Sequence, residues 1–255
     1  MKSRPLQTGV IYGPINSRRL GRSLGINILP TEKKVCTFDC VYCQYGWTNC
    51  RCDRETLEKL ELPTVEQVQA ELEPALAGID GLDAVTLAGN GEPTLHPAFK
   101  EIARTTAELR DRLKPKVPVC ILSNSSTLGM ASVREGLKFV DRKVMKLDAG
   151  TQSAFSTINR PSAPLQIETV VNHLSAMPGV EIQSLFFNGP LTNADEVSLA
   201  SWLNLIERIG PAAVQVYTLD RTPADHALCS VGHRRLEQIA EAVRKRLPQV
   251  RAQVF

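Results

Sequence analysis

Three cysteines within eight residues constrain this chain more than any other feature of its sequence. Cys36, Cys40 and Cys43 lie in the segment CTFDCVYC, with the spacing C-x3-C-x2-C. Thiolates in so short a loop can surround one soft metal centre, because cysteine is the usual ligand of iron–sulfur clusters and zinc. A closed zinc site or a saturated cluster needs four ligands, and residues 44–47 offer no obvious fourth. A cubane held by three cysteines leaves one iron open to an outside ligand, which indicates chemistry rather than scaffolding.

Two other interpretations of the thiols remain open on spacing alone. Cys40 and Cys43 could bind zinc together with Cys50 and Cys52, which would leave Cys36 spare. A disulfide framework is the second alternative. The first residues, MKSRP, are not followed by the apolar segment of a secretory signal, so we expect a cytoplasmic protein. In that compartment disulfides are rare, so the seven cysteines are expected to be metal ligands or free thiols.

The composition predicts a globular protein that does not cross a membrane. It is 43% hydrophobic and 22% charged, and no run approaches the roughly 20 apolar residues that span a bilayer. The net charge of +3 is too small to indicate a nucleic-acid partner by itself. Five basic residues nevertheless precede the first acidic residue, Glu32, and such an arm could contact phosphates, although a solvated or internally paired segment is the plainer interpretation. These residues are Lys2, Arg4, Arg18, Arg19 and Arg22.

Short β-branched runs alternate with helical patterns along the chain, which predicts βα units and a parallel sheet. Residues 1–24 look irregular, with a short strand or turn at 9–14. Six strands are expected at 26–29, 84–88, 117–122, 144–147, 180–187 and 213–219. Helical patterns lie between them, including one capped by Thr64 and Gln67, one around 133–137 and one capped by Asn193 that runs to about Ile209. A final helix ends near Leu247, and residues 250–255 form a possible edge strand.

Six strands in 255 residues predict an α/β fold with an incomplete (β/α)6 TIM-type barrel, since eight units would not fit comfortably. We expect a single domain over 1–255, with the basic arm at 1–24, the barrel core at 25–220 and the C-terminal helix and edge strand at 221–255. The cysteine segment directly follows the first expected strand. It therefore leaves the carboxyl end of that strand, where barrel active sites lie.

Each expected strand also ends in polar residues, so one rim of the barrel should be polar while the strands are apolar. Loops on a rigid scaffold commonly hold binding sites of this kind. The strand-end groups are Gly89 to Glu92, Ser123 and Asn124, Asp148, Asn188, and Asp220.

The cysteine octet, with the aromatic Tyr42 before its last cysteine, resembles the signature of the radical S-adenosylmethionine (SAM) superfamily. The resemblance implies that Cys36, Cys40 and Cys43 hold a [4Fe-4S] cluster whose open iron binds the amino and carboxylate groups of SAM. One electron, from an external donor of flavodoxin or ferredoxin type, then cleaves the sulfonium to methionine and a 5′-deoxyadenosyl radical. That radical abstracts hydrogen from a substrate, and the cofactors carry this chemistry while the protein supplies binding and orientation.

The same resemblance suggests which strand-end residues contact the cosubstrate. The segment GNGE at 89–92 is similar to a glycine-rich motif that often reads Gly-Gly-Glu, with Asn90 interrupting the glycine pair. A buried Lys146 needs a partner, either near Asp148 or on the cosubstrate carboxylate. The cosubstrate-binding residues implied are Tyr42, Gly89, Asn90, Gly91, Glu92, Ser123, Asn124, Lys146, Asp148, Asn188 and Tyr217, with the two tyrosines as neighbours of the adenine.

Further segments are similar to short radical SAM proteins related to the wyosine-base synthases of transfer RNA. They lie at 12–14, 17–21, 23–25, 36–44, 89–94, 146–150 and 158–161. The synthases carry a second cluster on cysteines that precede the radical motif, whereas no cysteine precedes Cys36 here. An auxiliary cluster on Cys50 and Cys52 would need distant partners, such as Cys120 or Cys229.

Three functions follow from the sequence. The first is a radical SAM enzyme acting on a nucleoside or RNA, and the second is one acting on a small molecule or peptide. The third is a non-catalytic zinc or iron–sulfur binding module.

Overall fold

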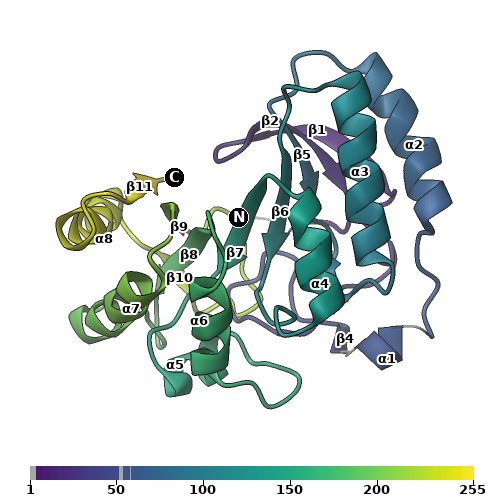
Figure 1. The fold of residues 1–255 in the computed structure, drawn as a ribbon. Helices are drawn as coiled ribbons and strands as arrows, with labels where there is room; N and C mark the ends of the chain where they lie inside the picture. The colour runs from purple at the N-terminus through teal and green to yellow at the C-terminus, as the bar shows by residue number, and fades with distance from the viewer. Residues whose placement is uncertain (1–3, 52–53, 58) are drawn as a thin grey trace. The chain divides into compact units, whose positions relative to one another are not determined.

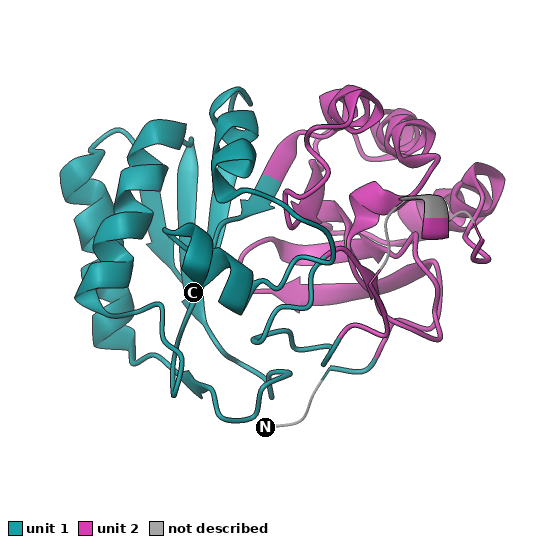
Figure 2. Cartoon of the chain, turned by 90° about the horizontal axis from the view of Figure 1, so that it is seen from below, with its two compact units in different colours: residues 1–5, 38–47, 144–255 teal, residues 6–37, 48–143 magenta. Residues whose placement is uncertain are grey.

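The computed structural model describes residues 4–51, 54–57 and 59–255, which form two compact units (Figure 2). Unit 1 comprises Phe38–Trp47 and Val144–Phe255 together with the start of the chain, and unit 2 comprises Leu6–Thr37 and Thr48–Lys143. The cysteine segment is therefore shared, with Cys36 in unit 2 and Cys40 and Cys43 in unit 1. Lys2 of the predicted basic arm and Cys52 lie outside the described residues.

Unit 2 contains an open sheet in the order β1-β2-β5-β6, and β1 is its outer edge. Strand β1 pairs with β2 in antiparallel fashion, whereas β2, β5 and β6 run parallel to one another. A separate parallel pair joins Val35 of β3 to Cys50 of β4. The strands are β1 (Ile11–Ser17), β2 (Gly21–Ile26), β3 (Val35–Cys36), β4 (Cys50–Arg51), β5 (Ala84–Leu87) and β6 (Val119–Ser123). The helices are α1 (Arg54–Leu57), α2 (Val65–Gly78), α3 (Phe99–Leu113) and α4 (Ala131–Gly136), with 3₁₀ turns η1 (Pro93–Leu95) and η2 (Leu137–Phe139).

Unit 1 contains the parallel order β7-β8-β9-β11, with β11 as its outer edge and the short β10 antiparallel to β8. Its strands are β7 (Arg142–Lys146), which begins in unit 2, β8 (Glu181–Asn188), β9 (Ala213–Thr218), β10 (Cys229–Ser230) and β11 (Arg251–Val254). Its helices are α5 (Gln152–Ile158), α6 (Ile167–Ser175), α7 (Glu196–Ile209) and α8 (His233–Arg246) (Figure 1).

Helices cover one face of the strands in unit 1 through apolar side chains. Val214 and Val216 alternate with Gln215 along β9, and all three are buried. Trp202 of α7 is buried, and its indole N–H donates to the Leu147 carbonyl (3.0 Å) and to the Ser184 hydroxyl (3.1 Å). Because the one polar atom of the indole is hydrogen-bonded to the sheet, it fixes the rotation of α7 about its axis, and the buried ring fixes how closely the helix packs.

Several expected elements are confirmed. The capping box of α2 is present, since the Gln67 N–H donates to Thr64 Oγ1 (3.2 Å) and the Thr64 N–H donates to Gln67 Oε1 (2.8 Å). The strands expected from 84 onward all occur, with ends that differ by a few residues. The C-terminal edge strand is β11, which pairs with β9.

The N-terminal expectations were partly wrong, although β1 overlaps the short strand or turn expected at 9–14. Residues 11–24 are not irregular, because β1 and β2 form a hairpin, and the first parallel strand is Gly21–Ile26 rather than 26–29. Gly25 explains why this glycine-rich stretch is a strand: a Cβ there would lie 2.1 Å from the Tyr12 ring. Tyr12 crosses that space and donates its hydroxyl proton to the Ala88 carbonyl (3.0 Å). The helices α1 and α5 and the β3–β4 pair were not expected at all.

The N-cap of α7 was also assigned to the wrong residue. Asp195 is the cap, and its Oδ1 accepts from the Val197 N–H (3.0 Å) and the Ser198 N–H (2.9 Å). Asn193 is buried two residues earlier and holds the loop instead, donating to the carbonyls of Asp148 (2.9 Å) and Leu185 (2.8 Å). Both residue types favour caps, so the sequence alone could not choose between them.

Replacing Asp195 with alanine should cost about 1 kcal/mol of stability at neutral pH, because two N–H groups of α7 lose their acceptor. Hydrogen bonds from the Ser198 hydroxyl and N–H lower the pKa of Asp195. A lowered pKa stabilises the fold above the unfolded value of about 3.9, and this contribution is lost as the pH falls through the folded value. The free energies of unfolding of wild type and Asp195→Ala, measured with urea, should therefore differ at pH 7 and become equal at acid pH. Asp195→Asn is the matched control and should retain most of the stability; an Asp195→Ala deficit that is the same at acid pH would contradict this account.

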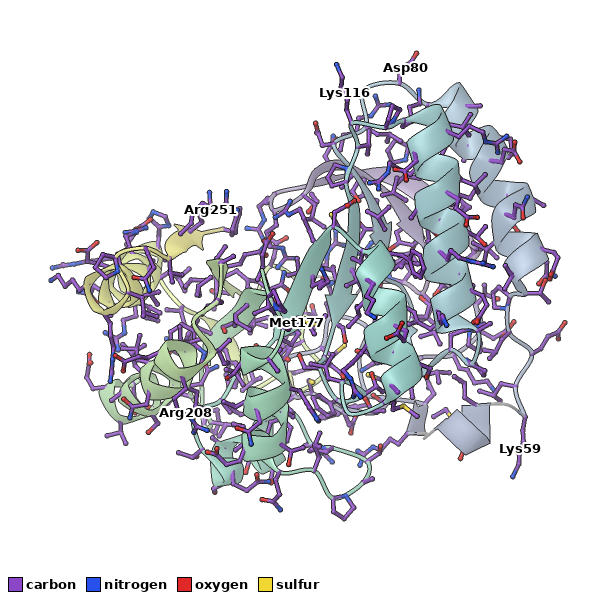
Figure 3. All side chains as sticks on the ribbon, viewed as in Figure 1. Lys59, Asp80, Lys116, Met177, Arg208 and Arg251 are labelled. Atoms are coloured by element: carbon purple, nitrogen blue, oxygen red, sulfur yellow. The ribbon has the colours of Figure 1, made fainter. Side chains whose placement is uncertain are left out.

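Charged side chains such as Asp80, Lys116 and Arg208 project from the surface (Figure 3). In unit 1, Arg208 of α7 pairs with Glu168 of α6 at 2.7 Å. In unit 2, Asp80 pairs with Lys114 at 2.9 Å. Within the described ranges, none of the helices has both the length and the apolar character needed to cross a bilayer.

Candidate cluster and cosubstrate site

In unit 1 the cysteine segment is held by the chain that follows α5. The Asp39 N–H donates to the carbonyls of Asn159 (3.1 Å) and Arg160 (3.3 Å), and the Val41 N–H donates to the Ile158 carbonyl (3.0 Å). Phe38 forms a β-bridge with Pro161. Residues 158–161, a segment that the sequence analysis noted only as a family resemblance, therefore form a strap along the cysteine segment.

Cys40 and Cys43 lie in one turn, in which the Cys43 N–H donates to the Cys40 carbonyl (3.0 Å). The Gly46 N–H in turn donates to the Cys43 carbonyl (3.1 Å). Cys40 is buried and Cys43 is half-buried, and neither forms a disulfide within the described residues. The backbone of the turn is thus fixed without a covalent bond between the sulfurs.

Asp148, just after β7, is the centre of a buried polar network in unit 1. Its Oδ1 accepts from the Leu185 N–H (2.9 Å) and lies 2.7 Å from Lys146 Nζ. Its Oδ2 accepts from the Tyr42 hydroxyl and from Asn159 Nδ2 (3.2 Å). Asp148 is only 2% exposed as a residue, so these four donors account for the stability of its carboxylate as a buried anion.

Lys146 and the two tyrosines surround this carboxylate. Lys146 Nζ donates to the Tyr217 hydroxyl (2.8 Å) and lies 5.0 Å from the Tyr42 ring centre and 4.8 Å from that of Tyr217. Burial acts to lower the pKa of Lys146, but attraction to Asp148 and Tyr217 outweighs it and the pKa is raised. Burial, followed by the charge of Asp148, raises the pKa of Tyr42 well above its usual range. At neutral pH Lys146 is therefore a cation and Tyr42 a neutral donor.

The network continues along the polar face of the unit 1 strands. The Tyr217 hydroxyl donates to Gln183 Oε1 (3.3 Å), Gln183 Nε2 donates to Gln215 Oε1 (2.9 Å), and Gln215 Nε2 donates to Glu181 Oε2 (3.1 Å). All the donors point the same way, from Lys146 toward Glu181, which strengthens each bond by polarisation. These glutamines were not predicted from the sequence, although the place of Gln215 between Val214 and Val216 was a readable signal.

In unit 2 the glycine-rich segment lies against the residue that precedes Cys36. The Val35 N–H donates to the Asn90 carbonyl (2.8 Å), and the Glu92 N–H donates to the Val35 carbonyl (3.1 Å). Gly91 has φ 146°, and a Cβ there would lie 1.6 Å from the Val35 oxygen, so only glycine permits this approach. Asn90 takes the place of a second glycine because its amide joins two loops, donating to the carbonyls of Gln7 and Pro30 (2.9 Å each).

Glu92 and Asn124 link the same segment to the end of β6. Glu92 Oε1 accepts from the Thr94 N–H (3.1 Å), and Oε2 accepts from the Asn124 N–H (2.6 Å). Glu92 is buried, and burial raises its pKa despite these hydrogen bonds. Asn124 Nδ2 donates to Thr37 Oγ1 (2.8 Å) and lies 3.4 Å from the Cys36 sulfur. Ser123 is buried beside them, and its hydroxyl accepts from the Ser125 N–H (3.1 Å).

The remaining predicted residues lie farther from these networks. Asn188, at the end of β8, is exposed, and its Oδ1 accepts from the Thr192 hydroxyl (3.2 Å). Cys50 packs beside the apolar side chains of Leu29, Val35, Leu57 and Leu95. Neither unit, in the part that the structure describes, groups three His, Cys, Asp or Glu side chains as a complete metal site, and the predicted ligands are divided between the two.

Two observations indicate that the residues suit a thiolate-bound cluster. Within the described residues Cys36, Cys40 and Cys43 form no disulfide, and each unit supplies an amide N–H to a sulfur: Asn124 to Cys36 at 3.4 Å and Asn159 to Cys40 at 3.5 Å. Amide donors around cysteine sulfurs are a usual means of stabilising iron–sulfur clusters. Asn159 was not among the predicted site residues, and its signal was its place in the segment INRP.

The comparisons with known proteins bear on the family and the fold. The model of the Radical SAM superfamily matches residues 34–152. A UPF0026 protein from Synechocystis sp. is 32% identical, covering 81% of this chain and 74% of that protein. A UPF0026 protein from Methanocaldococcus jannaschii is 28% identical, covering 85% of this chain and 65% of that protein. A protein named GTPase Obg from Brachyspira hyodysenteriae is 29% identical, covering 91% of this chain but 33% of that protein, so the chain spans only part of these relatives.

Solved structures share the fold at low sequence identity. A radical SAM methyltransferase from Sphaerobacter thermophilus has a TM-score of 0.63 at 14% identity, covering 91% of this chain and 65% of that one. Streptococcus suis SuiB bound to S-adenosylmethionine has a TM-score of 0.63 at 13% identity, covering 91% and 50%. TYW1 with a lysine-pyruvate adduct has a TM-score of 0.57 at 15% identity, covering 88% and 73%.

These likenesses confirm the expected fold class, an α/β partial barrel of the radical SAM core. The superfamily match also contains all three cysteines of the octet that first suggested the assignment. Taken with the 32% identity to the Synechocystis protein, this means that the chain belongs to the UPF0026 family and contains, at 34–152, a segment that matches the radical SAM superfamily.

Proposed function

We propose that this chain is a radical SAM enzyme that holds a [4Fe-4S] cluster on Cys36, Cys40 and Cys43 and binds SAM at the polar strand ends. The observation that supports it most directly is that an asparagine joins a cysteine of the octet to the strand ends in each unit. Asn124, at the end of β6, donates to Cys36, and Asn159 donates to both Cys40 and Asp148. Cluster ligands and cosubstrate-binding groups are thereby parts of the same two networks.

When bound, the cluster and SAM supply a one-electron cleavage of the sulfonium, giving methionine and a 5′-deoxyadenosyl radical that abstracts hydrogen from a substrate carbon. An external donor of flavodoxin or ferredoxin type would provide the electron. The chain's own residues bind and orient the reactants, and each unit has its own part in this.

In unit 2 the proposed task is to bind the amino acid end of SAM. Glu92 is a buried carboxyl group whose pKa is raised because burial disfavours its charged form. An ammonium group beside it would stabilise that charged form. Gly91 brings the backbone of this segment against Val35, directly before Cys36. The ammonium would therefore be held next to the first cluster ligand. Gly89, Asn90, Ser123 and Asn124 complete the binding loops.

In unit 1 the proposed task of Asp148 is to position other groups. Its two oxygens already accept four hydrogen bonds, so it fixes Lys146, Tyr42 and Asn159 rather than turning free lone pairs toward a ligand. The Lys146 cation is then placed to meet the SAM carboxylate. Tyr42 and Tyr217 flank it and are proposed as neighbours of the adenine, and Asn188 as an outer contact.

Anaerobic purification and reconstitution test this proposal directly. We expect a brown protein with absorbance near ~400 nm and about four irons per chain. Addition of SAM and dithionite should yield 5′-deoxyadenosine, measured by chromatography. Tightly bound stoichiometric zinc in place of iron would reject the enzyme in favour of a binding module, and an iron-loaded protein that never cleaves SAM would reject the proposed reaction.

A further inference from the structure

The two polar atoms of the Asn159 side-chain amide differ in their hydrogen bonding. Nδ2 has three neighbouring partners, whereas Oδ1 has none among the described residues. Its Nδ2 lies 3.2 Å from Asp148 Oδ2, 3.3 Å from the Tyr42 hydroxyl oxygen and 3.5 Å from the Cys40 sulfur. Its Oδ1 is buried and accepts no hydrogen bond within the described part of the chain. Leaving a buried acceptor unused costs free energy, and native structures rarely do so without a reason.

The backbone leaves this side chain little freedom to find another partner. The Asn159 N–H ends α5 by donating to the Phe155 carbonyl (2.9 Å), and the Asn159 carbonyl accepts from the Asp39 N–H (3.1 Å). Arg160, the next residue, adopts the left-handed region at φ 48°, and its side chain lies 3.7 Å from the Asp39 carboxylate. The strap is thus tied to the cysteine segment on both sides of Asn159.

Turning the amide over does not remove the problem. A flip about χ2 would place Oδ1 against the Asp148 carboxylate, where two acceptors would face each other without a proton. The orientation with Nδ2 toward Asp148 is therefore the one that the electrostatics favour. In that orientation Oδ1 finds no donor among the described residues.

We infer that Asn159 is a cosubstrate-binding residue. Its Oδ1 accepts a hydrogen bond from a hydroxyl or ammonium group of bound SAM, and its Nδ2 donates to the Cys40 sulfur. The inference rests on the proposed function, because it requires Cys40 to be a cluster ligand. One amide would then touch both the cosubstrate and a sulfur of the cluster, so that SAM is bound in a fixed position relative to Cys40.

The two halves of the amide predict two measurable effects. Loss of one hydrogen bond to the ligand should weaken SAM binding about tenfold in Asn159→Ala. Loss of the N–H donor to sulfur should make the cluster's reduction potential more negative, because a donor stabilises the extra negative charge of the reduced cluster. Iron content should stay near that of wild type, since all three cysteines remain.

The experiment compares reconstituted wild type, Asn159→Ala and Asn172→Ala, in which an exposed asparagine of α6 is the matched control. Dissociation constants are measured for SAM, for methylthioadenosine, which has the ribose but no amino acid, and for methionine, which has the amino acid but no ribose. Midpoint potentials come from an EPR-monitored titration. A selective loss of methylthioadenosine binding assigns the donor to a ribose hydroxyl, and a selective loss of methionine binding assigns it to the ammonium.

The inference is overturned if Asn159→Ala binds SAM and both fragments within about twofold of wild type. Should that variant not fold, Asn159→Leu serves in its place, because it keeps the branched shape of the side chain and removes both the donor and the acceptor without adding a charge. Its SAM binding should weaken about tenfold and its potential should become more negative, and unchanged SAM binding would sink the inference. A wild-type protein that holds no iron, or holds iron but binds no SAM, would instead remove the proposed function itself.

Discussion

Replacing Cys36, Cys40 or Cys43 with alanine is expected to abolish formation of 5′-deoxyadenosine and to lower the iron content of the reconstituted protein. Each thiolate anchors one iron of the proposed cubane, so losing one leaves a second iron without a protein ligand. Changes to outer-shell partners of metal sites typically cost about 10–100-fold in affinity or activity, and loss of a direct ligand should exceed that range. The measurement is iron per chain together with 5′-deoxyadenosine formed under dithionite.

The chain provides matched controls for this prediction among its other thiols. Cys229 of β10 is an exposed free thiol, and Cys50 of β4 packs against an apolar cluster. Cys229→Ser and the double change of Cys50 and Cys52 to serine should keep about four irons per chain. A substantial fall in iron in the double variant would revive an auxiliary cluster. Retention of cleavage in any of the three alanine variants would count against the assignment of the octet.

Asp148→Ala is expected to destabilise the protein by about 3–5 kcal/mol, because it removes one partner of a buried ion pair and leaves Lys146 without its counter-charge. The Lys146 side chain is 14% exposed and the Asp148 side chain 0%, so water cannot replace the lost partner. The Leu185 N–H, the Tyr42 hydroxyl and Asn159 Nδ2 lose their acceptor at the same time. Urea unfolding at pH 7 measures the difference.

Lys146→Met is the companion variant, because it removes the cation while keeping the length of the side chain. In the double variant Asp148→Ala/Lys146→Met the cost should be smaller than the sum of the two single changes, since no lone buried charge remains. Strict additivity, or an Asp148→Ala cost below about 1 kcal/mol, would show that Asp148 is not the organising group.

The pH dependence of Lys146→Met follows from the raised pKa of Lys146. A lysine whose pKa is raised by folding contributes stability that is complete below the unfolded value of about 10.4 and is lost as the pH rises through the folded value. Wild type should therefore keep a constant advantage over the variant from about pH 6 to 9. The advantage should fall only in more alkaline solution.

The alternation of strands and helices was legible in the sequence because the signals are local. Buried parallel strands are continuous apolar runs, and helices repeat with a period that neighbouring residues disclose. The octet was legible for the same reason, since its three thiols lie within one short loop. Where glycine, tyrosine and arginine mix, as at 9–25, that local signal was absent. The β1–β2 hairpin depends on the Tyr12 ring occupying the space above Gly25, which is a contact between strands.

The sequence by itself therefore determined the superfamily, the fold class and the residues proposed to hold the cluster, because each rests on residues close together in the chain. Only the tertiary structure decided which hydrogen-bonding role each strand-end residue has. Asp148 is surrounded by donors from Tyr42, Leu185 and Asn159, and Asn90 serves to join Gln7 and Pro30. The unused acceptor of Asn159 likewise exists only because Cys40, Tyr42 and Asp148 converge on its other end. Hydrogen bonding is directional and saturable, so the role of a polar side chain is set by which donors and acceptors surround it after folding.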